Sequence, residues 1–217
     1  MIISTKSKIK ISKPKILHTD KIEQFMILND PHFFQCFFEG LMIDEGIYEK
    51  VSFEQVVFRN VKFLNVSFQN IELIDCVFER CDLSNADFSG GFLNRVEFTD
   101  CKLLGLNLSD ATLRNVKFEN CQANFSEFGY GNLKQVLFKN CSLGNTDLFE
   151  SKLRQIHFLN CNLNEANFAK TPLKGIDLSS CQFNKIVITV EDLVGCEVNL
   201  DQAIGFLKLL GLKIKET

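Results

Sequence analysis

The sequence predicts a β-solenoid, a rod built of stacked coils, and a single repeating pattern supports this fold class. From residue 51 to residue 190 a five-residue pattern continues without an insertion or a deletion. Of the 28 central positions that recur every five residues from Phe53 to Ile188, 27 are Phe, Leu or Ile, and the exception is Ala123. The position two residues before each centre is mostly small or apolar, beginning with Val51, and the residues between are mostly polar.

A five-residue period matches neither the 3.6-residue turn of a helix nor the two-residue alternation of a strand. If each unit instead forms one side of a coil and then turns a corner, both apolar positions of every unit point inward. Successive coils can then hydrogen-bond to one another. With four units per coil, every fourth unit stacks in the same column, and residues 51–190 fill seven coils. We therefore expect a rod of roughly 34 Å over this range.

The repeat divides the chain into three segments, 1–30, 31–190 and 191–217. In the first segment we expect a tail and a capping helix, because Asp20 and Glu23 have the spacing of a helix-starting capping box. The early part of the second segment keeps the five-residue frame imperfectly, so we expect a degenerate first coil there. Such ends are needed because an open coil exposes both its core and its unpaired backbone.

After Ile188 the repeat pattern ends, and the residues that follow predict a short helical turn and then an amphipathic helix. Thr189 and Asp192 suit the start of the turn, whereas Asn199 and Gln202 suit the start of the helix, which Gly211 would end. The candidate dimer contacts lie at i, i+3, i+4 and i+7 on one face of this helix and are Ala203, Phe206, Leu207 and Leu210. Further apolar residues widen this face beyond what a cap should need, so we expect self-association. A purely intramolecular cap is the alternative.

The charge and the amino-terminal composition limit the possible functions and locations of the protein. The chain has 24 basic and 27 acidic residues, a net charge of −3, and the repeat itself is nearly neutral. The lysines near the amino terminus are not followed by an apolar run that could form a signal peptide or a membrane span, so we expect a cytoplasmic protein with no membrane partner. Their alternation with isoleucine predicts a solvated strand or tail.

All nine cysteines occupy the small inward position of the frame, and six of them, from Cys81 to Cys181, recur at every fourth unit, once per coil. Side chains stacked in parallel do not offer the geometry of a disulfide. We therefore expect small buried apolar residues in a reducing compartment. The three histidines are scattered and close neither a zinc site nor a catalytic group, so we expect no metal, no cofactor and no enzymatic activity.

The outward positions separate charge into two columns. The basic ladder repeats once per coil and consists of Arg114, Lys134, Arg154 and Lys174. The acidic column lies on the adjoining side and consists of Asp87, Glu127 and Asp147, with Asp110 and Glu150 near its corner. Such columns are either solvated faces or surfaces for electrostatic recognition of a partner.

One irregularity interrupts the repeat at mid-rod. Ala123 stands where Leu is expected, and the aromatic residues Phe125 and Tyr130 follow at positions that are mostly polar in other units. Two interpretations remain open. An aromatic side chain could fill the space left by the missing Leu, or the aromatic residues could form a surface patch or ligand cleft.

The unbroken five-residue frame resembles the pentapeptide-repeat family, whose fold is a right-handed, four-sided β-helix. The carboxy-terminal residues resemble those of the Qnr-type quinolone-resistance proteins and their Gram-positive relatives. The coils of this chain have no loop insertions. The residues that carry this second resemblance are Asp192, Leu193, Val194, Gly195, Gln202, Ala203, Ile204, Leu209, Leu210, Gly211 and Leu212.

This resemblance implies a homodimer joined through the carboxy-terminal helix, a rod with the width and surface character of duplex DNA that binds DNA gyrase and topoisomerase IV. Carried over by position, the acidic column stands in for phosphates, and Phe206, Leu207 and Leu210 form dimer contacts. Two other functions stay open. One is a cytoplasmic scaffold for another protein, bound through the basic ladder or the aromatic region. The other, ranked third, is direct nucleic-acid binding through the basic ladder.

Overall fold

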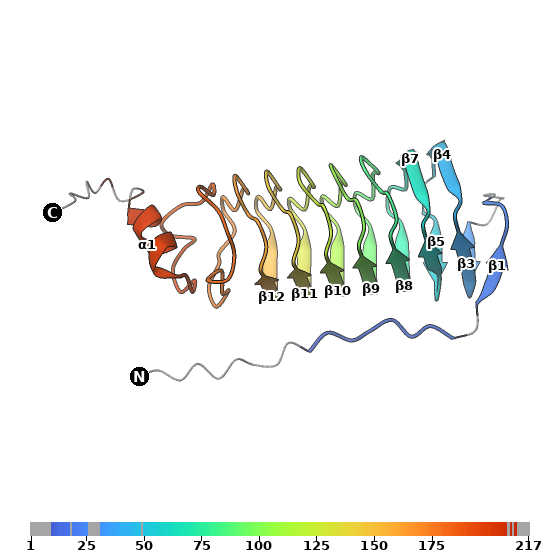
Figure 1. Ribbon diagram of the computed structural model, residues 1–217, viewed down its shortest axis with the longest axis horizontal. Coiled ribbons are helices and arrows are strands. Elements are labelled where there is room, and N and C mark those ends of the chain that lie inside the picture. Colours follow the sequence, from blue (N-terminus) through green and yellow to red (C-terminus); the bar gives the residue numbers. More distant parts are fainter. Residues whose placement is uncertain are drawn as a thin grey trace.

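The chain forms a straight rod of stacked parallel coils, with one helix at its carboxy-terminal end and an extended amino-terminal segment running beside it (Figure 1). All strand pairs are parallel, and most belong to one ten-stranded sheet. The computed structural model describes residues 10–17, 19–25, 31–48, 50–207, 209 and 211.

The elements are short at the amino-terminal end and become regular from β8 onward. Their bounds are β1 Asp20–Ile22, β2 His32–Phe34, β3 Cys36–Glu39, β4 Met42–Ile47, β5 Ser52–Glu54, β6 Val57–Arg59, β7 Lys62–Ser67, β8 Glu72–Glu79, β9 Phe92–Thr99, β10 Thr112–Glu119, β11 Asn132–Lys139, β12 Lys152–Leu159 and α1 Leu200–Leu207.

Coils pair in the register that four units per coil predict. Leu93 lies beside Leu113, which in turn lies beside Leu133, and the same offset joins β2 to β5 and β4 to β7. Strands β2, β3 and β4 therefore belong to a first coil that stacks on the next one. The β-solenoid fold class expected from the five-residue period is confirmed.

From Lys50 to Gly175, corners fall on the last residue of each five-residue unit, where the backbone takes a positive φ angle. The corner residues of β9 and β10, Arg95 and Asn115, have φ angles of 56° and 53° and interrupt the pairing within each strand. Strands β8 to β12 therefore each cover two sides of a coil. The other two sides are turns, joined to neighbouring coils by isolated bridges such as Asp82 to Lys102.

The core consists of inward columns of like residues. Phe98, Phe118 and Phe138 are fully buried, and their rings stack face to face with centroids 4.9 and 4.8 Å apart. The thiol of Cys121 donates to the carbonyl oxygen of Phe98 at 3.5 Å, and the other cysteines of its column repeat this bond. All nine cysteines are free, and eight are buried. Burial raises the pKa of the Cys76 thiol to about 12.

The amino-terminal cap differs from the prediction. Asp20–Ile22 form strand β1 beside β3 instead of starting a helix, because the Asp20 N–H donates to the carbonyl of Gln35 at 2.9 Å. The ring of Phe25 stacks on Phe33 with centroids 5.2 Å apart and covers the first coil. The rest of the predicted helix, residues 26–28, lies outside the described residues.

Residues 10–17, here called the strap, lie along the corner that β8 to β12 share (Figure 1). The Lys15 N–H donates to Asp75 at 2.8 Å, and the Ser12 N–H donates to Asn115 at 3.1 Å. Three residues of extended chain span roughly 10 Å, which matches the spacing of the two coils between these contacts. The strap therefore runs parallel to the rod axis.

Asp75 anchors the strap. The residue is 4% exposed, and its carboxylate accepts two hydrogen bonds of 2.6 Å from the Arg95 guanidinium, besides the bond from Lys15. Burial alone would raise the pKa of Asp75, but Arg95 and the Lys15 N–H together lower it below its ordinary value. The strap is thus held by an ionised carboxylate.

The carboxy-terminal helix α1 begins as the sequence predicts. The Asn199 N–H donates to the Gln202 side chain at 2.9 Å, and the Gln202 N–H donates to the Asn199 side chain at 3.0 Å. This reciprocal pair is a capping box. The Gln202 amide also donates to the carbonyls of Leu178 and Cys181, so it ties the helix to the last coil. The preceding turn is closed by Thr189.

Replacing one ring in the phenylalanine stack should destabilise the rod. For Phe118→Ala we expect a loss of about 3–5 kcal/mol, because the neighbouring rings cannot collapse into the space. Urea unfolding followed by circular dichroism measures this loss. The control Asn132→Ala, on the exposed surface, should stay within about 0.5 kcal/mol of the wild type. A loss below about 1 kcal/mol for Phe118→Ala would contradict a tightly packed column.

Asp75→Asn should loosen the strap, because the ion pair with Arg95 and the charged acceptor for Lys15 are both lost. Limited trypsin digestion should then cleave after Lys15 several-fold faster than in the wild type, whereas the exposed-corner control Asp110→Asn should cleave at the wild-type rate. Since the pKa of Asp75 is lowered in the fold, its stabilisation is present at neutral pH and is lost as the pH falls below about 4. Equal cleavage of all three proteins would refute the anchor.

Candidate interaction surfaces

The acidic column follows one turn side of the coils. Parallel bridges join Asp87 to Asn107, Asn107 to Glu127, and Glu127 to Asp147, so the three predicted carboxylates share one line that Asn107 interrupts. Asp87 and Asp147 are half-buried, and Glu127 is exposed. The structure thus brings these three together as the sequence predicts.

Neutral groups hold these carboxylates. Asp87 accepts hydrogen bonds from Gln69 at 2.9 Å and from Asn107 at 3.0 Å, and Asp147 accepts one from Asn167 at 2.8 Å. Burial would raise the pKa of Asp87, but the hydrogen bonds from Gln69 and its neighbours lower it. Because these donors carry no charge, they bind the carboxylates of Asp87 and Asp147 without neutralising them.

The other two predicted acidic residues, Asp110 and Glu150, occupy the corner beside the column. Both have positive φ angles there, and Tyr130 lies between them at the same corner. Glu150 lies 3.5 Å from the Lys170 ammonium, and this ammonium also lies 4.9 Å from the centre of the Phe149 ring. The Glu150 charge is therefore partly offset by a neighbour.

The mid-rod aromatic residues point outward. Phe125 and Tyr130 are each 57% exposed and occupy corners on either side of the acidic column. The interpretation that an aromatic ring fills the space beside Ala123 is wrong, because a corner residue with a positive φ angle directs its side chain away from the core. Tyr130 instead packs edge-on against Phe149, with centroids 5.5 Å apart.

The basic ladder lies on the sheet side of the coils. Arg114, Lys134 and Arg154 are successive register partners in β10, β11 and β12, and Lys174 follows one coil later. All four side chains are exposed. Sequence reasoning missed Lys152, which flanks the same inward Leu153 as Arg154 and faces outward with it. The alternation of inward and outward positions within the unit could have found it.

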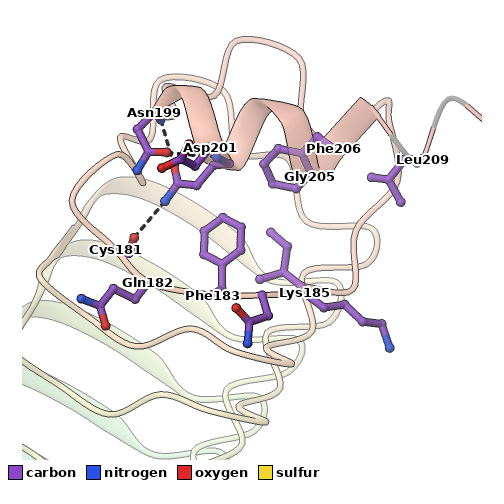
Figure 2. Close-up of a pocket in the computed structure, with 12 residues that line it drawn as sticks. Cys181, Gln182, Phe183, Lys185, Asn199, Asp201, Gly205, Phe206 and Leu209 are labelled. Carbon is purple, nitrogen blue, oxygen red and sulfur yellow. Dashed lines mark hydrogen bonds between the residues drawn. The ribbon is translucent and has the colours of Figure 1, made fainter. Parts of the chain in front are cut away.

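The carboxy-terminal end carries a groove of about 810 Å³ between the last coil and α1, and Figure 2 shows Phe183 and Phe206 facing each other across it. The centroids of these two rings are 5.8 Å apart. Of the candidate dimer contacts, Ala203, Phe206 and Leu207 are half-buried, and Leu210 lies outside the described residues.

The exposed apolar residues at this end are others. Leu200 is 76% exposed and Ile204 is 42% exposed, one turn apart on α1, and Leu209 follows at 46%. Leu200 and Ile204 lie on the helix surface away from Gln202, which is buried against the coil, whereas Leu209 follows the helix and lines the groove. The exposed apolar residues of α1 are therefore Leu200 and Ile204, whereas the expected contacts Ala203, Phe206 and Leu207 are half-buried.

Within the described ranges, no three His, Cys, Asp or Glu side chains are grouped to hold a metal ion. His32 is exposed and His157 half-buried, while His18 lies outside those ranges. Burial lowers the pKa of His157. Among the helices that can be described, none is long and apolar enough to span a membrane.

Several solved structures resemble the chain. A trypsin-treated variant of QnrB1, described as a plasmid-mediated fluoroquinolone resistance protein, is 17% identical, with 85% of this chain and 100% of that chain covered and a TM-score of 0.41. HetL, described as involved in heterocyst differentiation regulation in Nostoc sp. strain PCC 7120, is 12% identical, with 77% and 87% covered and a TM-score of 0.31. No curated protein matches the chain significantly.

The family comparison covers most of the chain. A model described as a pentapeptide repeat region matches residues 51–128, 71–148 and 131–203. These overlapping matches run from the first full coil into α1 and follow the five-residue frame that the coils display. The chain therefore belongs to the pentapeptide-repeat family.

Proposed function

We propose that this chain is a non-catalytic binding protein that mimics DNA and docks on DNA gyrase or topoisomerase IV, protecting them from quinolones. The observation that carries the proposal is the acidic column of Asp87, Glu127 and Asp147, one line of carboxylates on a straight rod. A DNA-binding groove recognises regularly spaced negative charge, because the phosphate backbone supplies most of the affinity of such proteins for DNA.

Two features of the column support this function. First, the hydrogen bonds to Asp87 and Asp147 come from uncharged side chains, and they lower the pKa of Asp87, so a basic groove would meet carboxylates that no cation neutralises. Second, the parallel stacking of the coils sets the distance between neighbouring positions of the acidic column at roughly 4.8 Å, so its charges have fixed places along the rod. The partner class itself comes from the resemblance of the carboxy-terminal residues to Qnr-type proteins.

Neutralising the acidic column should weaken this activity. Purified gyrase is titrated with the protein in a supercoiling assay, with and without a fluoroquinolone. For the triple variant Asp87→Asn, Glu127→Gln and Asp147→Asn, which keeps the side-chain shapes nearly unchanged, we expect protection or inhibition to need roughly tenfold more protein, because charge complementarity drives the encounter.

The matched control neutralises three carboxylates on other surfaces, Glu54→Gln, Glu72→Gln and Glu197→Gln, and should behave as the wild type. Absence of any effect of the wild-type protein on gyrase or topoisomerase IV, at large excess, would contradict the proposal. So would equal potency of the two triple variants, since the effect would then not depend on the column.

We place a homodimer at the carboxy-terminal end as part of this proposal. Leu200 and Ile204 give α1 an exposed apolar face, and the half-buried Ala203 and Leu207 border it. Two copies that pair through these helices bury this apolar surface and form a longer rod. Such an interface uses the same patch on both subunits, as two-fold symmetry requires.

Light scattering on the purified protein tests the dimer. The wild type should have twice the mass of one chain, and Ile204→Asp should be a monomer, because a buried unpaired carboxylate is costly. Ile47→Asp, at an 80% exposed apolar position near the opposite end of the rod, is the control and should stay dimeric. A monomeric wild type would rule out the dimer, and an Ile204→Asp variant that folds and dimerises would rule out this interface.

A second function, a scaffold for a different protein, is supported by the exposed aromatic pair Phe125 and Tyr130. Aromatic residues are enriched at protein interfaces, where they bury large areas. The gyrase assay separates the two functions, because a scaffold for another partner leaves supercoiling unchanged.

A further inference from the structure

The basic side chains of the rod fall into two groups. In the described range 95–207, the basic residues that are not on the outward positions of the ladder's side form ion pairs with carboxylates, most of them one coil away. These residues are Arg95, Lys102, Lys117, Lys139, Lys170 and Lys185. The basic residues without a carboxylate within ion-pair distance, in the same range, are Arg114, Lys134, Lys152, Arg154 and Lys174. All five lie on the sheet side that carries the ladder.

This side, here called the ladder face, comprises the outward residues of the units centred on Leu113, Leu133, Leu153 and Leu173. Its other outward residues are neutral: Thr112, Asn132 and Pro172. Like charges directly opposite one another on neighbouring strands are destabilising. A column of unpaired cations in register is therefore a cost to the fold that a bound polyanion would remove.

The strap lies along one edge of this face and adds the charge of its lysines to it. It is bonded to Asn115 and Gln135, the residues that follow Arg114 and Lys134, so its lysines lie beside the ladder. At the described start of the strap, Lys10 and Ile11 line a groove of about 420 Å³ along the same corner.

This groove is suited to an anion. Lys10 and Lys174 line it together with the side chains of Gln135, Gln155 and His157, and the other residues that line it are apolar or glycine. No carboxylate is among the described residues that line it. Two ammonium groups and the Gln155 amide thus surround a concave site on a face that is already positive, while the Gln135 amide donates to the carbonyl oxygen of Lys10.

An exposed aromatic ring borders the face. Tyr130 occupies the corner just before the unit of Lys134, and more than half of its side chain is accessible to solvent. Phe149 supports its ring edge-on from the next coil. Aromatic rings beside a basic groove are the usual stacking platform for bases in proteins that bind single-stranded nucleic acids.

We infer that the ladder face binds single-stranded nucleic acid without sequence specificity, with the phosphodiester backbone along the ladder and groove and a base stacked on Tyr130. The cations form a single line of roughly 14 Å over four coils, which follows one backbone. A flexible single strand can adjust the spacing of its phosphates to this line. The inference does not rest on the proposed function, because the ladder lies on another side of the rod from the acidic column, and Tyr130 lies at the corner between the two sides.

Fluorescence anisotropy with a labelled oligothymidylate of about 16 nucleotides tests the inference on the full-length protein. The double variant Lys134→Gln and Arg154→Gln should bind about tenfold more weakly. Between about 50 and 200 mM salt, its dependence of log affinity on log salt should be shallower by about 1.4, because two phosphate contacts are lost. Tyr130→Ala should weaken binding about fivefold or more with the salt dependence unchanged.

The matched control Lys62→Gln and Arg80→Gln removes the same charges at the other end of the rod and should bind as the wild type. Circular dichroism confirms that all variants fold. No anisotropy change with excess wild-type protein, or equal weakening of the two double variants, would overturn the inference. So would a preference for duplex DNA, or displacement of the probe by polyglutamate as readily as by unlabelled oligothymidylate, since the site would then recognise a duplex or any acidic chain.

Discussion

The fixed register between successive parallel coils determines nearly everything else in this molecule. Most backbone N–H groups of the repeat bond to a carbonyl one coil away, for example Asn120 to Lys139 and Asn140 to Leu159. A residue therefore lies against the residue at the same position of the preceding coil. Where the same residue type recurs at one position of successive coils, the side chains stack. Inward Phe residues then form a stack of rings, and outward charged residues form a column of charge.

Charge columns show how the chain manages this constraint. Where opposite charges alternate, the register pairs them: Arg59 bonds to Glu79 at 2.7 Å, and Lys139 bonds to Glu119 at 2.7 Å. Lys117 and Lys139 together lower the pKa of Glu119 to about 2. The acidic column and the basic ladder depart from this rule. Their charges remain available to partners, and for this reason both are better candidates for binding surfaces than the paired columns are.

The repeating part of the fold could be predicted from the sequence because its signal is the period itself. The core columns, the buried cysteines and the α1 capping box of Asn199 and Gln202 all follow from local spacing. The amino-terminal cap could not, because Asp20 and Glu23 match a helix signal while β1 is fixed by pairing with β3. The strap depends on Lys15 meeting a carboxylate 60 residues away, a contact without periodicity.

The corners carry a further consequence, for how such a chain changes length during evolution. Residues such as Asn120 and Asn140 take positive φ angles there, and every corner is followed by the same five-residue unit. Losing one residue would shift all later side chains between inside and outside. Duplicating one whole coil would instead keep every column of side chains and lengthen each column by one residue. The gene can therefore vary the length of the rod in steps of a coil while both charged surfaces keep their spacing.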